Sequence, residues 1–224
     1  EVAEEFDGYI RDLLDTRRQA GEQAPDDVTT QLMQEQINGN PMTDEELVSL
    51  LRNWTVGELA TISASISILT NYLAHHPALF NDLKAAPGQL ADAIDEILRM
   101  DAPLISNRRI TTRDVEIGGR RIPAGEKITL LWASANRDEN TFGDPDSFCP
   151  HQNAPNNLLY GAGIHICPGA PLARMELRIF MEELLRQING IEVSGSDAPE
   201  RAMFPAGGFN SLPLQFLGSD PKTF

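Results

Sequence analysis

Apolar residues recur at helical spacing over most of the chain. In residues 5–18 they line one helix face, with charged residues between them: Phe6, Ile10, Leu13 and Leu14. A break at residues 21–25 separates this helix from a second one, which Asp26 or Asp27 can cap. The pattern therefore predicts two amphipathic helices before a loop at residues 38–41.

A much longer helix is predicted next. Thr43 and Glu46 have the spacing of a capping box, and a single glycine is the only helix breaker before Pro77. The predicted length is about 30 residues, against a mean of about 12 in globular proteins. Two further helices are predicted, one after the Pro-Gly pair at 87–88 and one over residues 171–188.

Short strands replace helices between residues 109 and 130, where a Gly-Gly turn lies at 118–119. Residues 137–157 and the glycine-rich segment 161–169 are predicted as loops, and the tail carries two short apolar segments around residues 207–208. The predicted fold is mainly α, of the α+β class, with one small antiparallel sheet, and the length of 224 residues allows one large domain or two small ones.

Charge and cysteine content narrow the possible functions. The chain has 18 Lys and Arg against 33 Asp and Glu, a net charge of −15. Such a surface repels nucleic acid and anionic membranes, so we expect neither as a partner. No run of about 20 apolar residues predicts a membrane span. Cys149 and Cys167 give no disulfide framework, which fits the cytoplasm. The first residue is Glu1, without a start methionine or signal peptide, so we expect a cut chain.

The segment with the strongest chemical signal is Y-G-A-G-I-H-I-C-P-G at residues 160–169. Its glycines permit tight turns and a close approach to a flat object. Cys167 precedes a predicted helix, whose free N–H groups and dipole stabilise a thiolate. Such a thiolate suits a metal ligand beside a large planar cofactor. Two other interpretations are a small buried apolar cysteine and a His-x-Cys zinc site that lacks its other ligands.

Residues 160–174 resemble the cysteine-ligand loop of the cytochrome P450 superfamily of the soluble bacterial type, Phe-x-x-Gly-x-x-x-Cys-x-Gly. Gly163, Cys167 and Gly169 match this pattern, while Tyr160 replaces the usual Phe. The resemblance implies that Cys167 is the axial ligand of a haem b iron. It also implies that His165 binds a haem propionate and that Tyr160 presents an aromatic face to the cofactor.

The same resemblance extends to earlier residues. Glu96 and Arg99 fit the Glu-x-x-Arg pair that supports the core beneath the cysteine loop. The usual third member is an Arg before the cysteine, and alignment places Gln152 there, beside His151. Arg109 occupies the position of the strand arginine that binds the other propionate. Arg108 is the alternative in a shifted register, and a plain surface arginine is the alternative without function.

The long helix resembles the one that crosses the oxygen-binding face. Its register places Thr61 on the proton-delivery threonine and Ala60 where the acid belongs, with Glu58 two residues earlier. The resemblance implies catalytic roles for Thr61 and, through water, Glu58. Alternatively, Thr61 bonds the carbonyl four residues back and does nothing else, or the protein uses peroxide without this relay.

The resemblance also implies a substrate pocket. Its predicted lining has four members, for each of which ordinary core packing is the alternative: Gly57, Leu104, Ile105 and Phe209. The resemblance implies one haem-binding domain over residues 1–224, in which only the carboxy-terminal part of the family fold is matched and the amino-terminal part is absent. We therefore expect either a fragment or a natural truncation completed by association, because much apolar surface would otherwise be exposed.

The function implied is that of a haem-thiolate monooxygenase, which inserts one atom of O₂ into a small apolar substrate. A ferredoxin or flavin-type donor would supply electrons, docking near Arg174 and Arg178. The alternatives are a peroxide-driven variant and a non-catalytic haem-binding or haem-free interaction module. The sequence does not identify the substrate.

Overall fold

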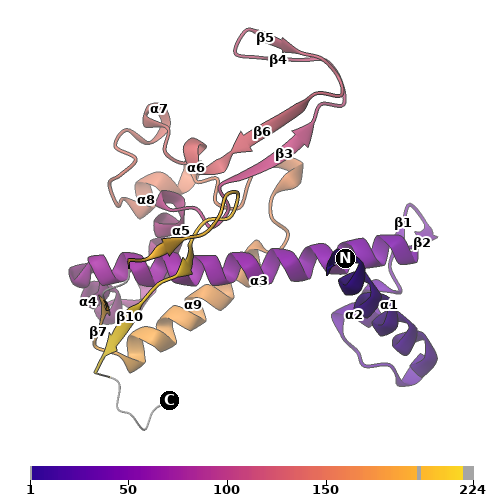
Figure 1. Cartoon of the computed structure of the whole chain (residues 1–224), viewed down its shortest axis with the longest axis horizontal. Coiled ribbons are helices and arrows are strands. Elements are labelled where there is room, and N and C mark those ends of the chain that lie inside the picture. The colour runs from indigo at the N-terminus through magenta and orange to yellow at the C-terminus, as the bar shows by residue number, and fades with distance from the viewer. Residues whose placement is uncertain (1, 196–197, 219–224) are drawn as a thin grey trace. The chain divides into compact units, whose positions relative to one another are not determined.

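The computed structural model describes residues 2–195 and 198–218. The chain divides into two compact units, Glu1–Ala60 and Thr61–Phe224 (Figure 1). One helix, α3 (Asp44–His75), contributes residues to both. Its length matches the long helix predicted from the sequence.

The unit Glu1–Ala60 is helical. It contains α1 (Val2–Ala20), α2 (Val28–Leu32), a hairpin of β1 (Gln36–Ile37) with β2 (Asn40–Pro41), and the first half of α3. The predicted helix pair is confirmed, and the predicted loop at 38–41 is instead part of this small hairpin. Apolar side chains of α1 and α3 form its core: Ile10, Leu14, Leu47 and Val48.

Local caps fix the helix starts in this unit. The Asp27 carboxylate accepts the Thr30 N–H at 2.9 Å, so Asp27 rather than Asp26 caps α2. The Thr43 N–H donates to the Glu46 carboxylate at 2.8 Å, and the Glu46 N–H donates to Thr43 Oγ1 at 3.3 Å. This hydrogen bonding lowers the pKa of Glu46 and confirms the predicted capping box.

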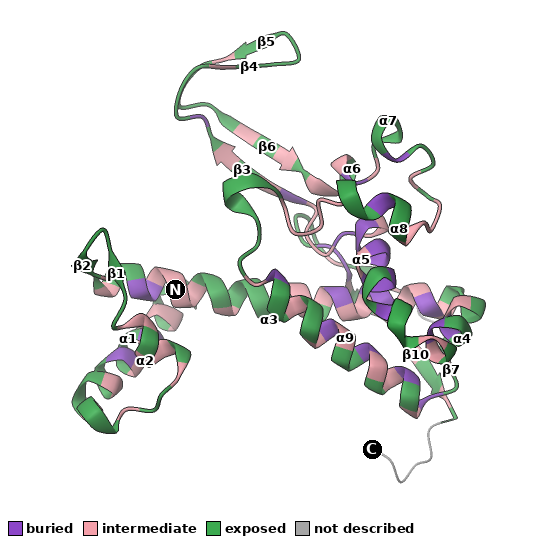
Figure 2. Ribbon diagram, turned by 180° about the vertical axis from the view of Figure 1, so that it is seen from behind, coloured by how far each residue is buried: buried purple, intermediate pink, exposed green. Residues whose placement is uncertain are grey.

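The core of the unit Thr61–Phe224 is built from the second half of α3 and three more helices: α4 (Pro77–Ala85), α5 (Leu90–Met100) and α9 (Ala170–Gln187). Helix α5 is mostly buried, whereas α9 is buried along one side only (Figure 2). Helix α4 was not predicted, because Pro77 was interpreted only as a stop. Proline is favourable at the first position of a helix, where its missing N–H costs nothing.

The strands of this unit form separate two-stranded antiparallel sheets rather than the single small sheet predicted. The pairs are β3 (Ser106–Ile110) with β6 (Lys127–Leu131), β4 (Val115–Ile117) with β5 (Arg120–Ile122), β7 (Gly190–Val193) with β10 (Leu214–Leu217), and β8 (Glu200–Arg201) with β9 (Phe209–Ser211). Gly118 and Gly119 form the β4–β5 turn with φ of 58° and 76°, as the Gly-Gly pair predicts.

Short helices interrupt the stretch that was predicted as loop. They are α7 (Glu139–Phe142) and α8 (Pro150–Asn153), and α6 (Trp132–Ala135) lies just before this stretch. The glycine-rich segment before α9 contains a single 3₁₀ turn at Gly163–His165. In the described ranges, no helix combines the length and apolar character that crossing a bilayer requires.

Candidate functional site

Backbone hydrogen bonds close the loop that carries Cys167. The Cys167 N–H donates to the Tyr160 carbonyl at 2.8 Å, and the Ile166 N–H donates to the Gly163 carbonyl at 3.2 Å. Gly161 and Gly163 turn the chain with φ of 75° and 64°, a region that favours glycine. The loop therefore has a fixed shape that other residues at 161 and 163 would strain.

Cys167 is exposed, contrary to the alternative of a buried apolar cysteine. It lies three residues before α9, which begins without a side-chain cap at Gly169. Helix starts carry free N–H groups and positive dipole charge, which favour a thiolate nearby. A Cβ atom at Gly169 would lie 3.9 Å from the Cys167 sulfur. Glycine at this position leaves room beside the thiol.

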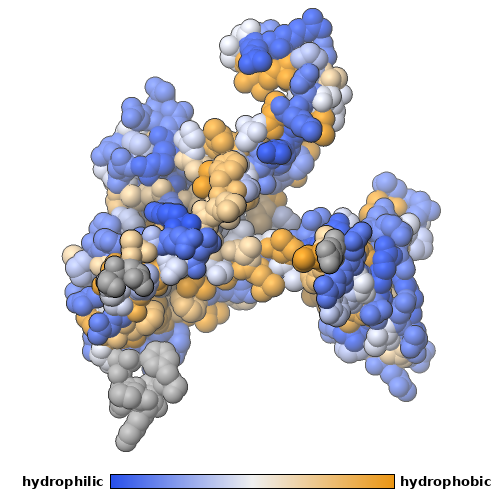
Figure 3. Space-filling model, in the orientation of Figure 1, coloured by the Kyte–Doolittle hydropathy of each residue, from blue (hydrophilic) through white to orange (hydrophobic). Residues whose placement is uncertain are grey.

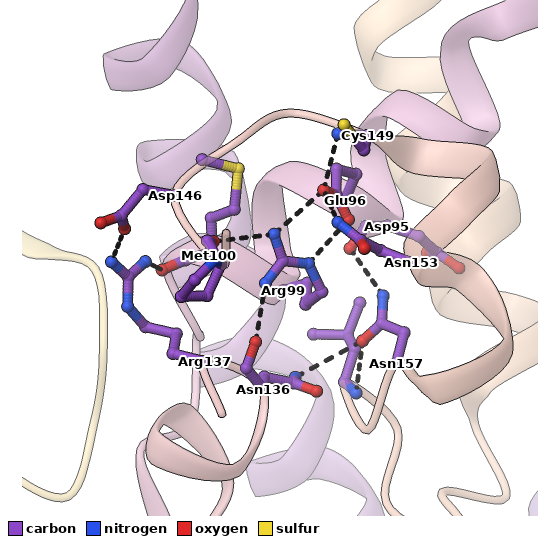
Figure 4. A network of polar contacts seen from close by, with 12 residues as sticks. Asp95, Glu96, Arg99, Met100, Asn136, Arg137, Asp146, Cys149, Asn153 and Asn157 are labelled. Atoms are coloured by element: carbon purple, nitrogen blue, oxygen red, sulfur yellow. Dashed lines mark hydrogen bonds and ion pairs between the residues drawn. The ribbon is translucent and has the colours of Figure 1, made fainter. Parts of the chain in front are cut away.

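A buried ion pair lies beneath the segments that lead to the loop (Figure 4). Arg99 donates two hydrogen bonds to Glu96, at 2.8 and 3.0 Å, and both side chains are essentially unexposed at 0% and 1%. Arg99 also donates to the carbonyls of Asn136 at 2.7 Å and Pro145 at 3.0 Å. The predicted structural pair is thus buried and linked to the chain before the loop.

The third side chain of the network around Glu96 and Arg99 is Asn153, not Gln152. Asn153 Nδ2 donates to Glu96 at 2.7 Å, and the Cys149 N–H donates to the same oxygen at 3.0 Å. Gln152 is exposed, and His151 approaches Asp92 at 3.5 Å instead. The one-residue difference arises because α8 turns Asn153 inward. Cys149, for which the sequence suggested no role, contributes its backbone.

These partners determine the charge of Glu96. Burial alone would raise the pKa of the Glu96 carboxyl, but the hydrogen bonds from Arg99, Cys149 and Asn153 outweigh it and lower the pKa. Glu96 is therefore ionised, and its negative charge is balanced by Arg99.

Two asparagines, which the sequence did not single out, hold the start of the loop. Asn136 is fully buried and accepts the Leu158 N–H at 2.7 Å. Asn157 donates to the Asp95 carbonyl at 3.0 Å and accepts the Leu159 N–H at 2.9 Å. Their only sequence signal is membership of an Asn-rich stretch, which normally indicates a solvated loop.

Tyr160 and Arg174 link the loop to α5 and α9. The Arg174 guanidinium lies 4.3 Å from the centroid of the Tyr160 ring and pairs with Asp95 at 2.9 Å. The Tyr160 hydroxyl is buried without a hydrogen-bond partner, and burial raises the pKa of Tyr160 well above its ordinary value. A pocket of about 200 Å³ adjoins these three side chains.

The two cations that the sequence suggested for donor docking are both paired. Arg174 pairs with Asp95, and Arg178 pairs with Glu182 at 2.7 Å. Neither arginine therefore offers an uncompensated positive charge beside the loop.

His165 and Arg109 lie on different elements. His165 is exposed in the 3₁₀ turn of the loop. Arg109 is half-buried in β3 and donates to the Arg108 carbonyl at 2.8 Å; in the ranges described it forms no ion pair. Their roles at propionates stay predictions, as does the choice of Arg109 over Arg108.

The residues predicted on the oxygen face lie on α3. Thr61 is half-buried, and its carbonyl accepts the Ser65 hydroxyl at 2.7 Å. Gly57 and Glu58 are exposed on the same helix, in the unit Glu1–Ala60. Their roles stay predictions.

The tail turn brings two predicted pocket segments together, one with Leu104 and Ile105 and the other with Phe209. The Ile105 N–H donates to the Pro205 carbonyl at 3.0 Å, and Leu104 forms an isolated antiparallel β-bridge with Ala206. A Cβ atom at Gly208 would lie 2.9 Å from the Ala64 Cα of α3. Phe209 follows at the start of β9, half-buried, under the Arg201 guanidinium at 4.3 Å. The turn thus joins the segments of Leu104, Ile105 and Phe209 next to α3.

The loop residues fit a large apolar planar group bound through sulfur. Ile164 and Ile166 precede the exposed Cys167 in the loop, with 95% and 59% of their surfaces exposed, and Gly169 leaves space beside the sulfur. In the part of the chain that the structure describes, no group of three or more His, Cys, Asp or Glu side chains could hold a metal ion. The zinc alternative is therefore unsupported, and a single thiolate with apolar neighbours suits haem.

Comparisons with known proteins identify the family. The family model described as Cytochrome P450 matches residues 89–216. The steroid C26-monooxygenase of Mycolicibacterium smegmatis is 33% identical over 95% of this chain and 53% of its own length. The cyclomarin C epoxidase CymV of Salinispora arenicola is 36% identical over 76% of this chain and 43% of its own length.

Solved structures agree. The crystal structure of CYP109E1 from Bacillus megaterium in complex with testosterone superposes with a TM-score of 0.84 at 30% identity, covering 95% of this chain and 58% of that one. The chain thus spans about half the length of the relatives that it matches. The family's cofactor is haem b. The chain belongs to the cytochrome P450 family and corresponds to part of the length of its members.

Proposed function

We propose that residues 1–224 form the haem-binding part of a monooxygenase that oxidises a small apolar organic substrate with O₂. The observation that carries this proposal is the exposed Cys167 in a loop closed by backbone bonds and supported by the buried Glu96–Arg99 pair. Haem with a thiolate ligand supplies the activation of O₂ for transfer of one oxygen atom.

Within this proposal, each residue has a specific task. Cys167 holds the iron, while His165 and Arg109 bind the propionates. The glycines of the loop and the Tyr160 ring shape the space beside the sulfur. On α3, Thr61 delivers a proton and Glu58 supplies it through water. Gly57, Leu104, Ile105 and Phe209 contact the substrate.

The partners are proposals as well. A ferredoxin or flavin-type protein supplies the electrons. The remaining part of the family fold, about half of each relative's length, completes the domain. We place the protein in the cytoplasm. A peroxide-driven reaction is the second candidate, because Ala60 stands where the family carries an acid.

The test is a Cys167→Ser variant, measured together with the segment that completes the domain. Serine keeps the size of the side chain but cannot supply a thiolate, so the red-shifted absorption band of the reduced, CO-bound protein disappears. Cys149→Ser is the matched control and leaves the band unchanged, because only the backbone of Cys149 contacts Glu96.

A band that survives in Cys167→Ser would refute the ligand assignment. A wild-type protein that binds no haem would instead support the non-catalytic interpretation. Product formation with peroxide and no redox partner would identify the peroxide-driven variant.

A further inference from the structure

Helix α5 carries two adjacent acidic residues, Asp95 and Glu96, and each has its own arginine. Glu96 pairs with Arg99 of the same helix and holds the chain before the cysteine loop through Cys149 and Asn153. Asp95 pairs with Arg174 of α9, which follows the loop. The loop is thus held by one ion pair on each side.

The second pair extends into the loop through the Tyr160 ring. The Arg174 guanidinium lies 4.3 Å from the ring centroid, while its Nε and Nη2 both lie 2.9 Å from one Asp95 oxygen. A planar guanidinium can stack on a ring and bind a carboxylate at the same time, whereas an ammonium cannot reproduce both contacts. Arg174 therefore fixes the ring relative to α5.

Tyr160 passes this constraint to Cys167. The Tyr160 carbonyl accepts the Cys167 N–H at 2.8 Å, the bond that closes the loop. A shift of Tyr160 therefore moves the backbone that carries the sulfur.

The Asp95 carboxylate is largely buried. Its side chain is 24% exposed, and one carboxylate oxygen is buried without a hydrogen-bond partner. Burial raises the pKa of Asp95, and Arg174 counteracts that rise. Asp95 is thus the more enclosed partner of the pair, and its contact with the half-exposed Arg174 connects α5 to α9.

We propose that Arg174, held by Asp95 and stacked on Tyr160, is a positioning residue for the Cys167 ligand and not a docking charge. This inference rests on the proposed function for its effect on haem, but the effect on the loop itself is independent of the cofactor. Residues that hold a metal ligand through such contacts orient the ligand and tune the bound metal.

The test compares Arg174→Ala with Arg178→Ala in two measurements. Both changes remove one positive charge from the same helix, and Arg178 also forms an ion pair, with side-chain exposure of 44% against 53% for Arg174. The first measurement, on the haem-free chain, is amide hydrogen exchange at Cys167. Its protection falls about tenfold in Arg174→Ala and stays unchanged in Arg178→Ala.

The second measurement is the spectrum of the reduced, CO-bound protein reconstituted with haem and the completing segment. Arg174→Ala and Asp95→Asn lower the fraction that shows the thiolate band, and Arg178→Ala does not. Arg174→Lys, which keeps the charge but not the stacked fork, gives an intermediate loss in both measurements. It also serves as the milder variant if the alanine protein does not fold.

Equal effects of Arg174→Ala and Arg178→Ala on exchange and spectrum would overturn the inference. So would full protection of the Cys167 amide in both Arg174→Lys and Asp95→Asn. If the wild type shows no thiolate band while Arg174→Ala still loses amide protection, the positioning role stands and the proposed function fails.

Discussion

At the scale of single residues, the Glu96–Arg99 ion pair is distinguished by its complete burial. Arg99 is 0% exposed. It donates two hydrogen bonds to Glu96 and one to each of two backbone carbonyls, and its guanidinium lies 4.8 Å from the centroid of the Phe142 ring. The i,i+3 spacing of such a pair is normally that of a weak surface contact. Removing one partner of a buried pair leaves an uncompensated charge, which is strongly destabilising.

We therefore expect Glu96→Gln to lower the free energy of unfolding by about 3–5 kcal/mol. Glu183→Gln is the matched control, because Glu183 also pairs with an arginine three residues on, Arg186, but in an exposed position. Its expected cost is much smaller, because an exposed ion pair is screened by water and contributes little to stability. Chemical denaturation of both variants measures the difference, and equal costs would contradict the role assigned to burial.

We also expect the effect of Glu96→Gln on the free energy of unfolding to depend on pH. The pKa of Glu96 is lower in the folded chain than its ordinary value of 4.5, so the unfolded chain takes up the proton first. The stabilisation by Glu96 is complete above about pH 4.5 and is lost as the pH falls through the lower, folded-state pKa. The stability gap between wild type and Glu96→Gln should therefore narrow in acid, as denaturation at several pH values would measure. A gap that widens there would reverse the sign of this argument.

The residues that sequence predicted correctly are those whose partners are close in the chain. Thr43 with Glu46 and Glu96 with Arg99 are each three positions apart, a spacing that a helix turns into a contact. Asn153 and Asn136 contact residues 57 and 22 positions away. No periodicity predicts such contacts, since they depend on how loops pack on α5.

At the scale of elements, the tail turn shows how closely two segments approach. A Cβ atom at Gly207 would lie 1.9 Å from the Ala102 carbonyl oxygen, a backbone atom that cannot rotate away. The Gly207 N–H also donates to the Pro103 carbonyl at 2.9 Å. Glycine is needed here for space, because the turn lies directly on the chain before Leu104.

Gly207→Ala should therefore separate the tail turn from residues 102–105 and lower the free energy of unfolding by about 1–3 kcal/mol. Gly88→Ala is the control, because nothing lies within 4 Å of a Cβ at Gly88. The readout is thermal unfolding together with amide exchange at Ile105, whose N–H bonds Pro205. An unchanged Ile105 amide in Gly207→Ala would show that the turn accommodates a side chain.

The sequence predicted long elements better than short ones. Helices α3 and α9 extend close to their predicted ends, since many periodic positions support each. Helices α7 and α8 have four residues each, too few to show a period, and they were predicted as loop. The four strands between residues 106 and 131 were located correctly but joined into one sheet, because alternation within a strand does not identify its partner.

At the scale of the whole molecule, α9 has two apolar faces. Leu177, Met181 and Leu185 are buried in the core, while Leu172, Met175 and Ile179 lie on the opposite face and are 44%, 47% and 51% exposed. Apolar residues gather where α9 lies in the space-filling view (Figure 3). A helix that is apolar on opposite sides is normally covered on both, which fits a chain of about half its relatives' length.

We expect the isolated chain to self-associate through this exposed face, and Ile179→Lys to reduce that association several-fold in sedimentation velocity. Gln187→Lys adds the same charge at the end of the same helix and should have little effect. Adding the completing segment should abolish self-association of the wild type. A wild-type chain that is monomeric alone would argue against an uncovered interface on α9.

The positions in the chain of the residues that hold the cysteine loop also affect when the loop can fold during synthesis. Four of these residues precede the loop, namely Asp95, Glu96, Arg99 and Asn136, and Arg174 follows Cys167 by only seven residues. Because a ribosome releases the chain from its amino end, each of these residues except Arg174 has emerged before the cysteine does. The loop can therefore reach its final shape as soon as the first turns of α9 leave the exit tunnel, and the nascent protein could accept its cofactor before synthesis ends.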